Sequence, residues 1–434
     1  MSGHTGSSRN LGLLLELVFH QPGLTRYPDA TILFITTDTM KYLVAFDKFK
    51  GALTALEAAH LAADTISGID PDASVELAPL TDGGEGFAGI LAEVLGGELR
   101  EVEVPGPLFN PVTGRFALID ASSIPAKAMD RLQLDVQGKI AIVEMASASG
   151  YECLTDDQRD PWKTTTIGTG KLMQAAIEAG AEAIILGIGG SATNDCGAGA
   201  LEALGVHYYD ITLQAIENVT PENFRLVTTV GSTSHLLDKF PPVRIACDVT
   251  NSLLGENGAT AVFGPQKGLK PEDKDRMERN MRKMATRFLG LFGKAPVDWE
   301  DYLAEPGSGA AGGIGFALVH ALPDSAFVEG FPLVAELMDL HGKIADADVV
   351  ITGEGYLDES SLGGKGPVGV VRMASGAKRV ILLAGSMEEA TLQSLQANQT
   401  NLEGLAISDP DWPLEKKIAS NKETLPATLK KLLS

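Results

Sequence analysis

Short apolar runs alternate with longer amphipathic segments from Lys41 onward, and this alternation predicts strands followed by helices. Such a succession is typical of the α/β class with largely parallel sheets. The expected strands are Tyr42–Phe46, Ser74–Ala78, Ile140–Glu144, Ala183–Gly187, Val243–Cys247, Val349–Thr352 and Val380–Ala384. The expected helices are Thr54–Ser67, Gly86–Leu95, Gly170–Ala179, Pro271–Phe292, Gly309–His320 and Gly366–Ala374, with a further amphipathic helix at the C-terminal end.

The chain has 434 residues, about three times the length of a usual single domain, so more than one domain is expected. Residues 1–39 do not share the alternating pattern. Their apolar stretch, LGLLLELVF, is short and contains Glu16, so a secretory signal and a membrane span are both disfavoured. We expect this segment to be a flexible extension.

Charge and cysteine content restrict the possible partners. The formal net charge is -22, so a polyanionic partner such as nucleic acid would be repelled. An anionic substrate must then be held locally by backbone N–H groups and a few lysines. The three cysteines form no CxxC pair, which disfavours a disulfide framework and a zinc site, and indicates a reducing, cytoplasmic location.

Glycine-rich polar segments follow five of the expected strands. Ligands bind at the carboxyl edge of open parallel sheets, because loops and helix N-termini meet there. We therefore expect one site to be built from several distant loops. The candidate residues are Asp47, Lys50, Asp82, Glu85, Ser191, Thr193, Asn194, Asp195, Asp248, Glu354, Asp358 and Lys365.

The most specific of these segments is IGGSATNDCGAG, from Ile188 to Gly199. Its glycines permit close backbone approach, and its short polar side chains can bind a phosphate or a carboxylate. The alternative is a structural turn in which Asn194 and Asp195 cap the next helix. As a functional residue, Asp195 would be a base for the attacking hydroxyl.

The segment TDGGEG, from Thr81 to Gly86, places two acids among glycines at an expected helix start. Magnesium takes oxygen ligands of this kind, usually one or two carboxylates plus phosphates. The spacing D-x-x-E also fits a capping box. We interpret Asp82 as a metal ligand and Glu85 as the cap.

Lysines supply the candidate phosphate contacts. Lys48 and Lys50 flank Phe49, and on an extended backbone they share one side. Lys365 follows two glycines but does not complete a Walker A motif. GSGAAG, from Gly307 to Gly312, matches a dinucleotide-binding pattern without the strand that should precede it, so it supports only a glycine-rich helix start.

Together these loops resemble the glycerate kinase family of the bacterial type. The resemblance extends from about Lys41 to about Ser386 and rests on strings in a fixed order. They are DKFKG, PLTDGGEG, VEMASASG, RDPWKTTTIGTG, LGIGGSATNDCGAG, ACDVTNSLLGENGATAVFGPQKG, PGSGAAGG, ITGEGYLD and GGKGP. The chain departs from the family pattern at Lys48, where Ser is usual, at Tyr356, where Arg is usual, and at Cys196, often Gly.

The resemblance implies ATP-dependent phosphorylation of D-glycerate with Mg²⁺, commonly on the 2-hydroxyl, in a monomer or homodimer. It also implies a discontinuous Rossmann-like domain of residues 40–80 plus 290–434, a second α/β domain of residues 81–289, and a site in the cleft between them. No nucleic-acid or membrane partner is expected.

Our hypothesis gives each candidate a role. Catalytic roles go to Asp195, Lys50 and Asn194, and substrate binding goes to Ser191, Thr193 and Asp47. The nucleotide phosphates would meet Gly353, Glu354, Lys365 and Gly309, and magnesium would be held by Asp82 and Asp248. Two rival functions remain: an NAD-dependent hydroxy-acid oxidoreductase, motivated by GSGAAG, and a non-catalytic glycerate sensor, motivated by Tyr356 and Lys48.

Overall fold

Two large β-sheets and one small sheet organise the chain in the computed structural model, which describes residues 39–232 and 236–434. The expectation for residues 1–39 therefore falls outside the described residues, apart from Thr39. Residues Met40–Ser434 form one compact unit by their mutual contacts. No helix in the described part of the chain is both long and apolar enough to cross a membrane.

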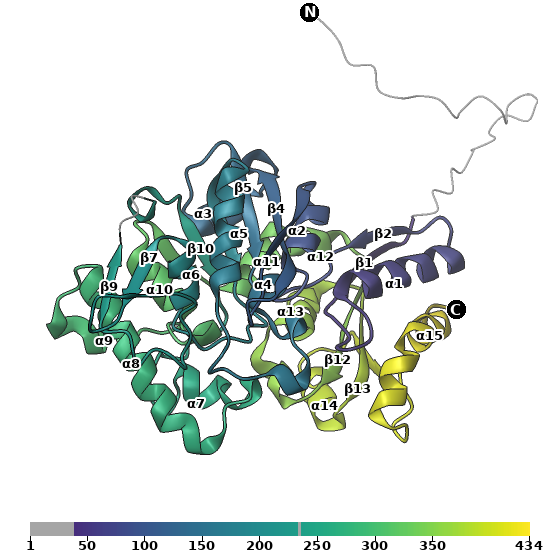
Figure 1. The fold of residues 1–434 in the computed structure, drawn as a ribbon. Coiled ribbons are helices and arrows are strands. Elements are labelled where there is room, and N and C mark those ends of the chain that lie inside the picture. The colour runs from purple at the N-terminus through teal and green to yellow at the C-terminus, as the bar shows by residue number, and fades with distance from the viewer. Residues whose placement is uncertain (1–38, 233–235) are drawn as a thin grey trace, which may run out of the picture. The chain divides into compact units, whose positions relative to one another are not determined.

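The first sheet joins the two ends of this unit. It has five parallel strands in the order β14-β13-β12-β1-β2. They are β1 (Lys41–Phe46), β2 (Ser74–Leu77), β12 (Val349–Leu357), β13 (Arg379–Met387) and β14 (Leu402–Ala406). In Figure 1 the purple β1 accordingly lies near the green β12 and β13, although many residues separate them in sequence.

Alternation along these strands places helices on both faces of the first sheet. Val44 and Ile351 face α1 (Ala55–Ile69) and α15 (Leu414–Leu433), whereas Leu43 and Val350 belong to the core on the other face. That other face packs against α12 (Leu340–Asp346), α13 (Gly366–Met373) and α14 (Glu389–Gln396). Both faces are buried, as parallel sheets require.

The second sheet has six strands in the order β11-β10-β6-β5-β4-β3. The strands are β3 (Glu98–Pro105), β4 (Pro111–Asp120), β5 (Lys139–Glu144), β6 (Ala181–Gly187), β10 (Val243–Ala246) and β11 (Ser325–Val328). Pairing is parallel from β5 to β11 and antiparallel for β3 and β4. The prediction of an α/β fold with largely parallel sheets is confirmed, but the antiparallel pair was not expected.

Helices cover the second sheet on both faces as well. One face packs against α2 (Phe87–Leu95), α3 (Ala126–Leu132) and α11 (Gly330–Leu337). The other packs against α5 (Ile167–Glu178), α6 (Ala198–Ala203), α8 (Lys274–Leu291) and α10 (Ile314–Ala321). The division into two domains stays a prediction, although β11 departs from it, because residues 325–328 join the sheet expected for 81–289.

A small antiparallel sheet and three short helices complete the unit. The sheet contains β7 (Val206–Tyr209), β8 (Ala215–Ile216) and β9 (Thr229–Ser232), in the order β8-β7-β9. The short helices are α4 (Ala146–Ser149), α7 (Ala259–Phe263) and α9 (Trp299–Leu303).

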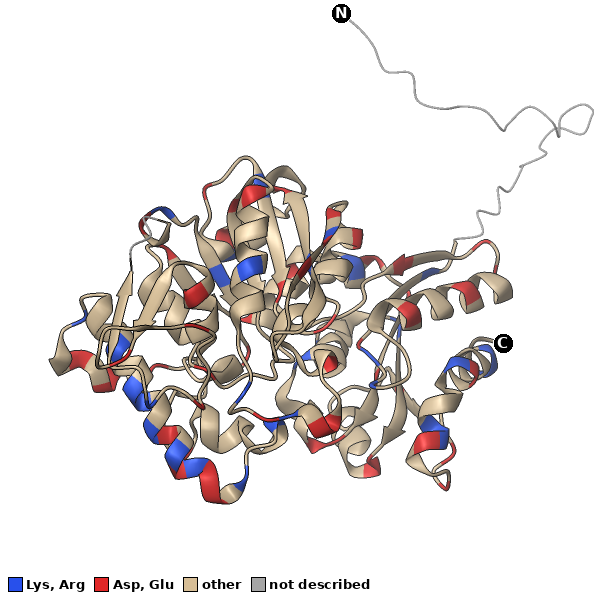
Figure 2. Ribbon diagram, viewed as in Figure 1, with Lys and Arg blue, Asp and Glu red and all other residues tan. Residues whose placement is uncertain are grey.

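Helix α8 carries a dense pattern of charges, with blue and red residues interleaved along it in Figure 2. Met277, Met281, Met284 and Phe288 nevertheless lie on one buried face. The charged residues therefore form the solvent-facing side of an amphipathic helix.

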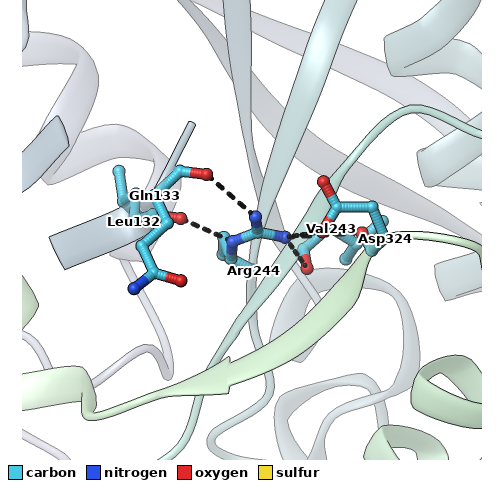
Figure 3. A network of polar contacts seen from close by, with 5 residues as sticks. All are labelled: Leu132, Gln133, Val243, Arg244 and Asp324. Carbon is cyan, nitrogen blue, oxygen red and sulfur yellow. Dashed lines mark hydrogen bonds and ion pairs between the residues drawn. The ribbon is translucent and has the colours of Figure 1, made fainter. Parts of the chain in front are cut away.

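Arg244 fastens the middle of the second sheet to a neighbouring helix. Its guanidinium group is buried on β10 and donates to the carbonyl oxygens of Leu132 and Gln133, which end α3 (Figure 3). It also pairs with Asp324, just before β11, at 2.8 Å. A buried cation is tolerated here because its donors are satisfied and a helix C-terminus carries partial negative charge.

Candidate active site

Polar loops from both large sheets meet at the carboxyl ends of their strands. Asp47 follows β1, Asp82 follows β2, Ser191 follows β6, and Asp248 follows β10. The fifth segment differs from the expectation, because β12 continues to Leu357 and so contains Gly353 and Glu354. These two residues are held by strand pairing with β13 and are not part of a free loop.

Asp82 stands at the centre of this edge and lines three adjacent cavities. A cavity of about 280 Å³ is also lined by Asp47, Glu354 and Lys365. One of about 180 Å³ is lined by Ser191, Asp248 and Lys267 among others. A third, of about 240 Å³, is lined by Lys48, Glu85 and Glu144. The side chain of Asp82 is exposed, and its Oδ1 accepts one hydrogen bond, 3.2 Å from Gly84 N.

The neighbouring carboxylates repel one another. Burial, with a smaller contribution from the negative charge of Asp82, raises the pKa of Asp47 to about 6. Burial also raises the pKa of Asp248; Lys365 opposes this shift and Asp82 adds to it. The pKa of Glu354 is raised to about 7 by burial and, less strongly, by Asp47 and Asp358. Glu354 Oε1 is buried without a hydrogen-bond partner.

This arrangement suits a divalent cation that shares its coordination with a ligand. Over residues 39–232 and 236–434, no three or more His, Cys, Asp or Glu are grouped to hold a metal by themselves. Magnesium is usually held by one or two carboxylates, with phosphate and water oxygens completing the shell. The exposed Asp82 carboxylate and the repulsion it exerts on Asp47 and Asp248 fit that requirement.

Cations border the carboxylates on two sides. Lys365 Nζ donates to the carbonyl oxygen of Asp248. Lys48 Nζ lies 3.3 Å from Glu85 Oε2, and Lys50 is exposed. A cavity of about 700 Å³ is lined by Lys48, Lys50, Tyr151 and Arg159.

The interpretation of Glu85 as a helix cap is wrong, and Gly309, predicted to contact nucleotide phosphates, is closely packed. Glu85 does not cap a helix: α2 begins at Phe87 after Gly86, with no side-chain cap, and Glu85 pairs with Lys48. Gly309 is packed against the carbonyl oxygen of Ser252, where an added Cβ would lie 2.0 Å away. The residues after Gly309 line the cavity of Ser191 and not that of Lys365.

Asp195 is enclosed by hydrogen-bond donors of the protein itself, which is unfavourable for the predicted role as a base. It is fully buried, and its two oxygens accept hydrogen bonds from Thr166 N, Thr166 Oγ1, Gly197 N and Gly199 N. Burial raises its pKa, and these hydrogen bonds oppose the shift. With its oxygens occupied, Asp195 ties α5 to the start of α6, which is close to the structural alternative.

The other polar residues of this loop differ in whether their side chains reach a cavity. Thr193 and Asn194 are fully buried, and Asn194 Nδ2 donates to Thr260 Oγ1 at 3.1 Å. Ser191 is 6% exposed and lines the cavity of Asp82 and Asp248. Only Ser191 of these three side chains is therefore placed to contact a ligand in that cavity.

Lys267 was missed by sequence reasoning. Its Nζ lies 3.0 Å from Ser191 Oγ and 2.6 Å from the carbonyl oxygen of Thr193. Burial lowers its pKa to about 7, against the opposing charge of Asp195. Its sequence signal is the string FGPQKG, which is part of the family resemblance, and its side chain contacts the Ser191 loop.

Glycines hold the two central loops together. Gly189 N donates to Gly83 O at 3.0 Å, and a Cβ at Gly187 would lie 2.4 Å from that same oxygen. A Cβ at Gly189 would lie 2.8 Å from Gly84 Cα. The loops that carry Asp82 and Ser191 thus touch through their main chains.

Comparison with known proteins adds independent evidence. The model of the glycerate kinase family matches residues 42–434. The chain is 38% identical to glycerate kinase of Bacillus subtilis, covering 80% of this chain and 85% of that protein. It is 37% identical to glycerate 2-kinase of Escherichia coli, with 81% and 86% covered. A crystal structure named as glycerate kinase 2 of Salmonella typhimurium matches with a TM-score of 0.70 and 35% identity, covering 91% and 97%.

Proposed function

Because this chain belongs to the glycerate kinase family and is therefore a kinase, we propose that it transfers the γ-phosphoryl group of ATP to D-glycerate. We propose the 2-hydroxyl as acceptor, since one relative is named glycerate 2-kinase. The oxidoreductase alternative loses its support, because GSGAAG contains Ala311 at φ 51° and its Gly309 packs against Ser252 instead of opening a phosphate loop.

The observation that carries this proposal is the position of Asp82 between cavities with different linings. One side offers Lys365 and Asp47, and the other offers Ser191 and Asp248. Phosphoryl transfer needs a metal between two anionic reactants and needs little covalent help from the protein. An exposed carboxylate shared by two cavities is suited to that position.

Magnesium, in this proposal, is held by Asp82 together with Asp47 or Asp248. The ion would neutralise negative charge on the transferring phosphoryl group. The chain's own contribution is to keep these carboxylates close despite their repulsion, so that binding a cation releases that repulsion.

The two reactants differ in size, and so do the cavities. The cavity of about 180 Å³ next to Ser191 suits a three-carbon acid. The cavities of about 280 and 700 Å³ contribute Lys365, Lys48 and Lys50, whose charges suit the phosphates of a nucleotide. We propose that the polyphosphate lies across Asp82 and that glycerate lies beside Ser191.

The direct test is phosphorus NMR of the product formed from D-glycerate and ATP with Mg²⁺. The expected product is 2-phosphoglycerate, together with ADP. Formation of 3-phosphoglycerate would reject the proposed acceptor hydroxyl but not the kinase. If glycerate is bound without any ADP formation at any magnesium concentration, the sensor hypothesis replaces the kinase.

A further inference from the structure

The proposed reaction needs an acceptor for the proton of the attacking hydroxyl, and the expected acceptor is not available. Asp195 has no exposure and receives four hydrogen bonds from neighbouring donors. The pair Ser191 and Lys267 lies on the same loop system but has an open side. Both residues line the cavity that also contains Asp82 and Asp248.

We propose that Ser191 and Lys267 form a proton-accepting pair for phosphoryl transfer, in which Ser191 Oγ meets the substrate hydroxyl and Lys267 Nζ receives the proton through it. This proposal rests on the proposed kinase reaction. Ser191 is the catalytic residue of the pair, and Lys267 is a positioning residue that acts through Ser191.

The hydrogen-bond distances around Lys267 accommodate a neutral amine in the resting pair. A neutral amine has two N–H donors and one lone pair. Donation to Thr193 O at 2.6 Å uses one donor, and the lone pair can accept the hydroxyl proton of Ser191, whose Oγ is 3.0 Å away. The residue is 2% exposed, so water does not replace these partners. A buried amine is harder to charge than an exposed one.

The charged groups around Lys267 are few. Asp195 is the group whose charge acts on the amine and favours its protonated form. Asp82, Asp248, Cys247 and Tyr151 line the same cavity. Burial outweighs Asp195 and lowers the pKa of Lys267 to about 7, so the amine can both accept and release a proton near neutral pH.

The proton balance of the step is simple. The glycerate hydroxyl oxygen forms a bond to the γ-phosphorus as the bond from that phosphorus to the bridging oxygen of ATP breaks, and ADP leaves with the bonding electrons. The hydroxyl proton moves to Ser191 Oγ, and the proton of Ser191 moves to Lys267 Nζ. The resulting ammonium later releases one proton to solvent, which is the proton that the overall reaction liberates.

The first experiment is the pH profile of kcat for the wild-type chain and for Lys267→Met, Lys267→Arg and Ser191→Ala. Wild-type kcat should rise about tenfold per pH unit below pH 7 and level off above it. Each variant should lose about 10²-fold or more of kcat at pH 8, with KM for ATP changed less than about threefold. Lys267→Arg should fail like Lys267→Met, since arginine stays protonated.

Matched controls separate this role from its competitors. Lys270→Met changes an exposed lysine three residues away and should keep both the rate and the profile. The pKa of Asp47 is also raised, so its ionisation is the competing explanation for a rise of kcat with pH. If Asp47→Asn abolishes the rise of kcat below pH 7 while Lys267→Met keeps it, the proposal is overturned. Ser191→Ala removes one hydroxyl from a folded loop and keeps the test valid if Lys267→Met does not fold.

A second experiment does not depend on activity. The pKa of Lys267 is about 7 when folded and 10.5 when free, so unfolding near pH 8.5 should take up about one proton more in the wild type than in Lys267→Met. Calorimetry in buffers of different ionisation enthalpy measures this difference. Equal uptake by the two proteins overturns the proposal. A wild type that shows the extra uptake but forms no phosphoglycerate at any pH overturns the proposed function, and the relay with it.

Discussion

The two halves of the candidate site differ in how their carboxylates are satisfied. On the loop from Ser191 to Asp195, most side chains are buried, and Asp195 receives four hydrogen bonds from neighbouring donors. On the opposite side, Asp82 is exposed and Asp47 and Asp248 are half-buried, and burial together with a smaller contribution from the charge of Asp82 raises the pKa of both Asp47 and Asp248.

This difference separates residues that maintain the loop from residues that meet a ligand. A buried charge is stable when the protein itself supplies its partners. Acids crowded at an open surface are stable only if something from outside, such as a cation, neutralises them. The more distinctive sequence motif therefore supplies mainly structure, and the more ordinary acids supply the proposed chemistry.

The largest expected effect comes from Asp82→Asn. Losing the shared carboxylate should lower kcat by about 10³-fold, because magnesium binding depends on it. The thermal midpoint should not fall, since the repulsion on Asp47 and Asp248 is relieved. A coupled ADP-release assay over a magnesium series, together with calorimetry, measures both quantities. The control is Asp64→Asn, which changes an exposed acid on α1. A loss of kcat below tenfold for Asp82→Asn would contradict the assignment of Asp82 as a magnesium ligand.

Asp195→Asn tests the stability of the buried loop from Ser191 to Asp195. In either orientation its new N–H group would face a donor, Gly197 N on one side or Thr166 and Gly199 on the other, so the free energy of unfolding should fall by about 3 kcal/mol. Urea denaturation measures this loss. Thr166→Val, which removes one hydroxyl of the same network, should cost about 1 kcal/mol. Unchanged stability with a large loss of kcat would restore Asp195 as the base.

The pH dependence of the free energy of unfolding tests the raised pKa of Asp47, on the side of the site that contains Asp82. The folded pKa of Asp47 is about 6 against an ordinary value of 3.8, so between these values the folded protein holds a proton that the unfolded chain releases. The contribution of Asp47 to the free energy of unfolding is therefore present at low pH and is lost as the pH rises to about 6. Without magnesium, the free energy of unfolding should fall by about 2 kcal/mol more between pH 4 and pH 7 in the wild type than in Asp47→Asn.

Denaturation curves at several pH values test this sign. Adding Mg²⁺ should reduce the wild-type decline, because the ion favours the ionised carboxylate. A decline of equal size in both proteins would remove Asp47 as its source.

The smallest effect is expected for Lys48→Ser. The ion pair with Glu85 is 3.3 Å long between partly exposed side chains, so the free energy of unfolding should change by less than about 1 kcal/mol. KM for ATP should rise a few-fold if Lys48 contacts the nucleotide. A change in kcat larger than tenfold would place Lys48 closer to the reacting atoms than the cavity of about 700 Å³ implies.

Sequence patterns predicted the parallel strands well and the edge elements poorly. Strands such as β5 and β6 are continuous apolar runs between helices, because both faces of a parallel sheet are buried. Strand β3, with the sequence ELREVEVP, lies at a sheet edge and exposes most of its charges, so it lacked that signal. Helix α15 is long, from Leu414 to Leu433, and contains Pro426, a residue that is disfavoured inside a helix.

For the site, the sequence predicted which loops lie together, but not which of their side chains remain accessible to a ligand. Asp47, Asp82, Asp248 and Lys365 follow from one rule, the carboxyl edge of parallel strands. The burial of Asp195 and the burial of Lys267 depend on contacts with Thr166 and Ser191 from distant segments. No local spacing in the sequence encodes such contacts.

The main-chain contact between Gly83 and Gly189 has a mechanical consequence. The separation of the metal-side acid from the acceptor-side serine is set by peptide units, with no side chain in between that could repack. This contact favours movement of the two loops together in any motion that admits or releases reactants. Substrate entry would depend on hinges elsewhere in the chain, and the reacting geometry would persist through each cycle.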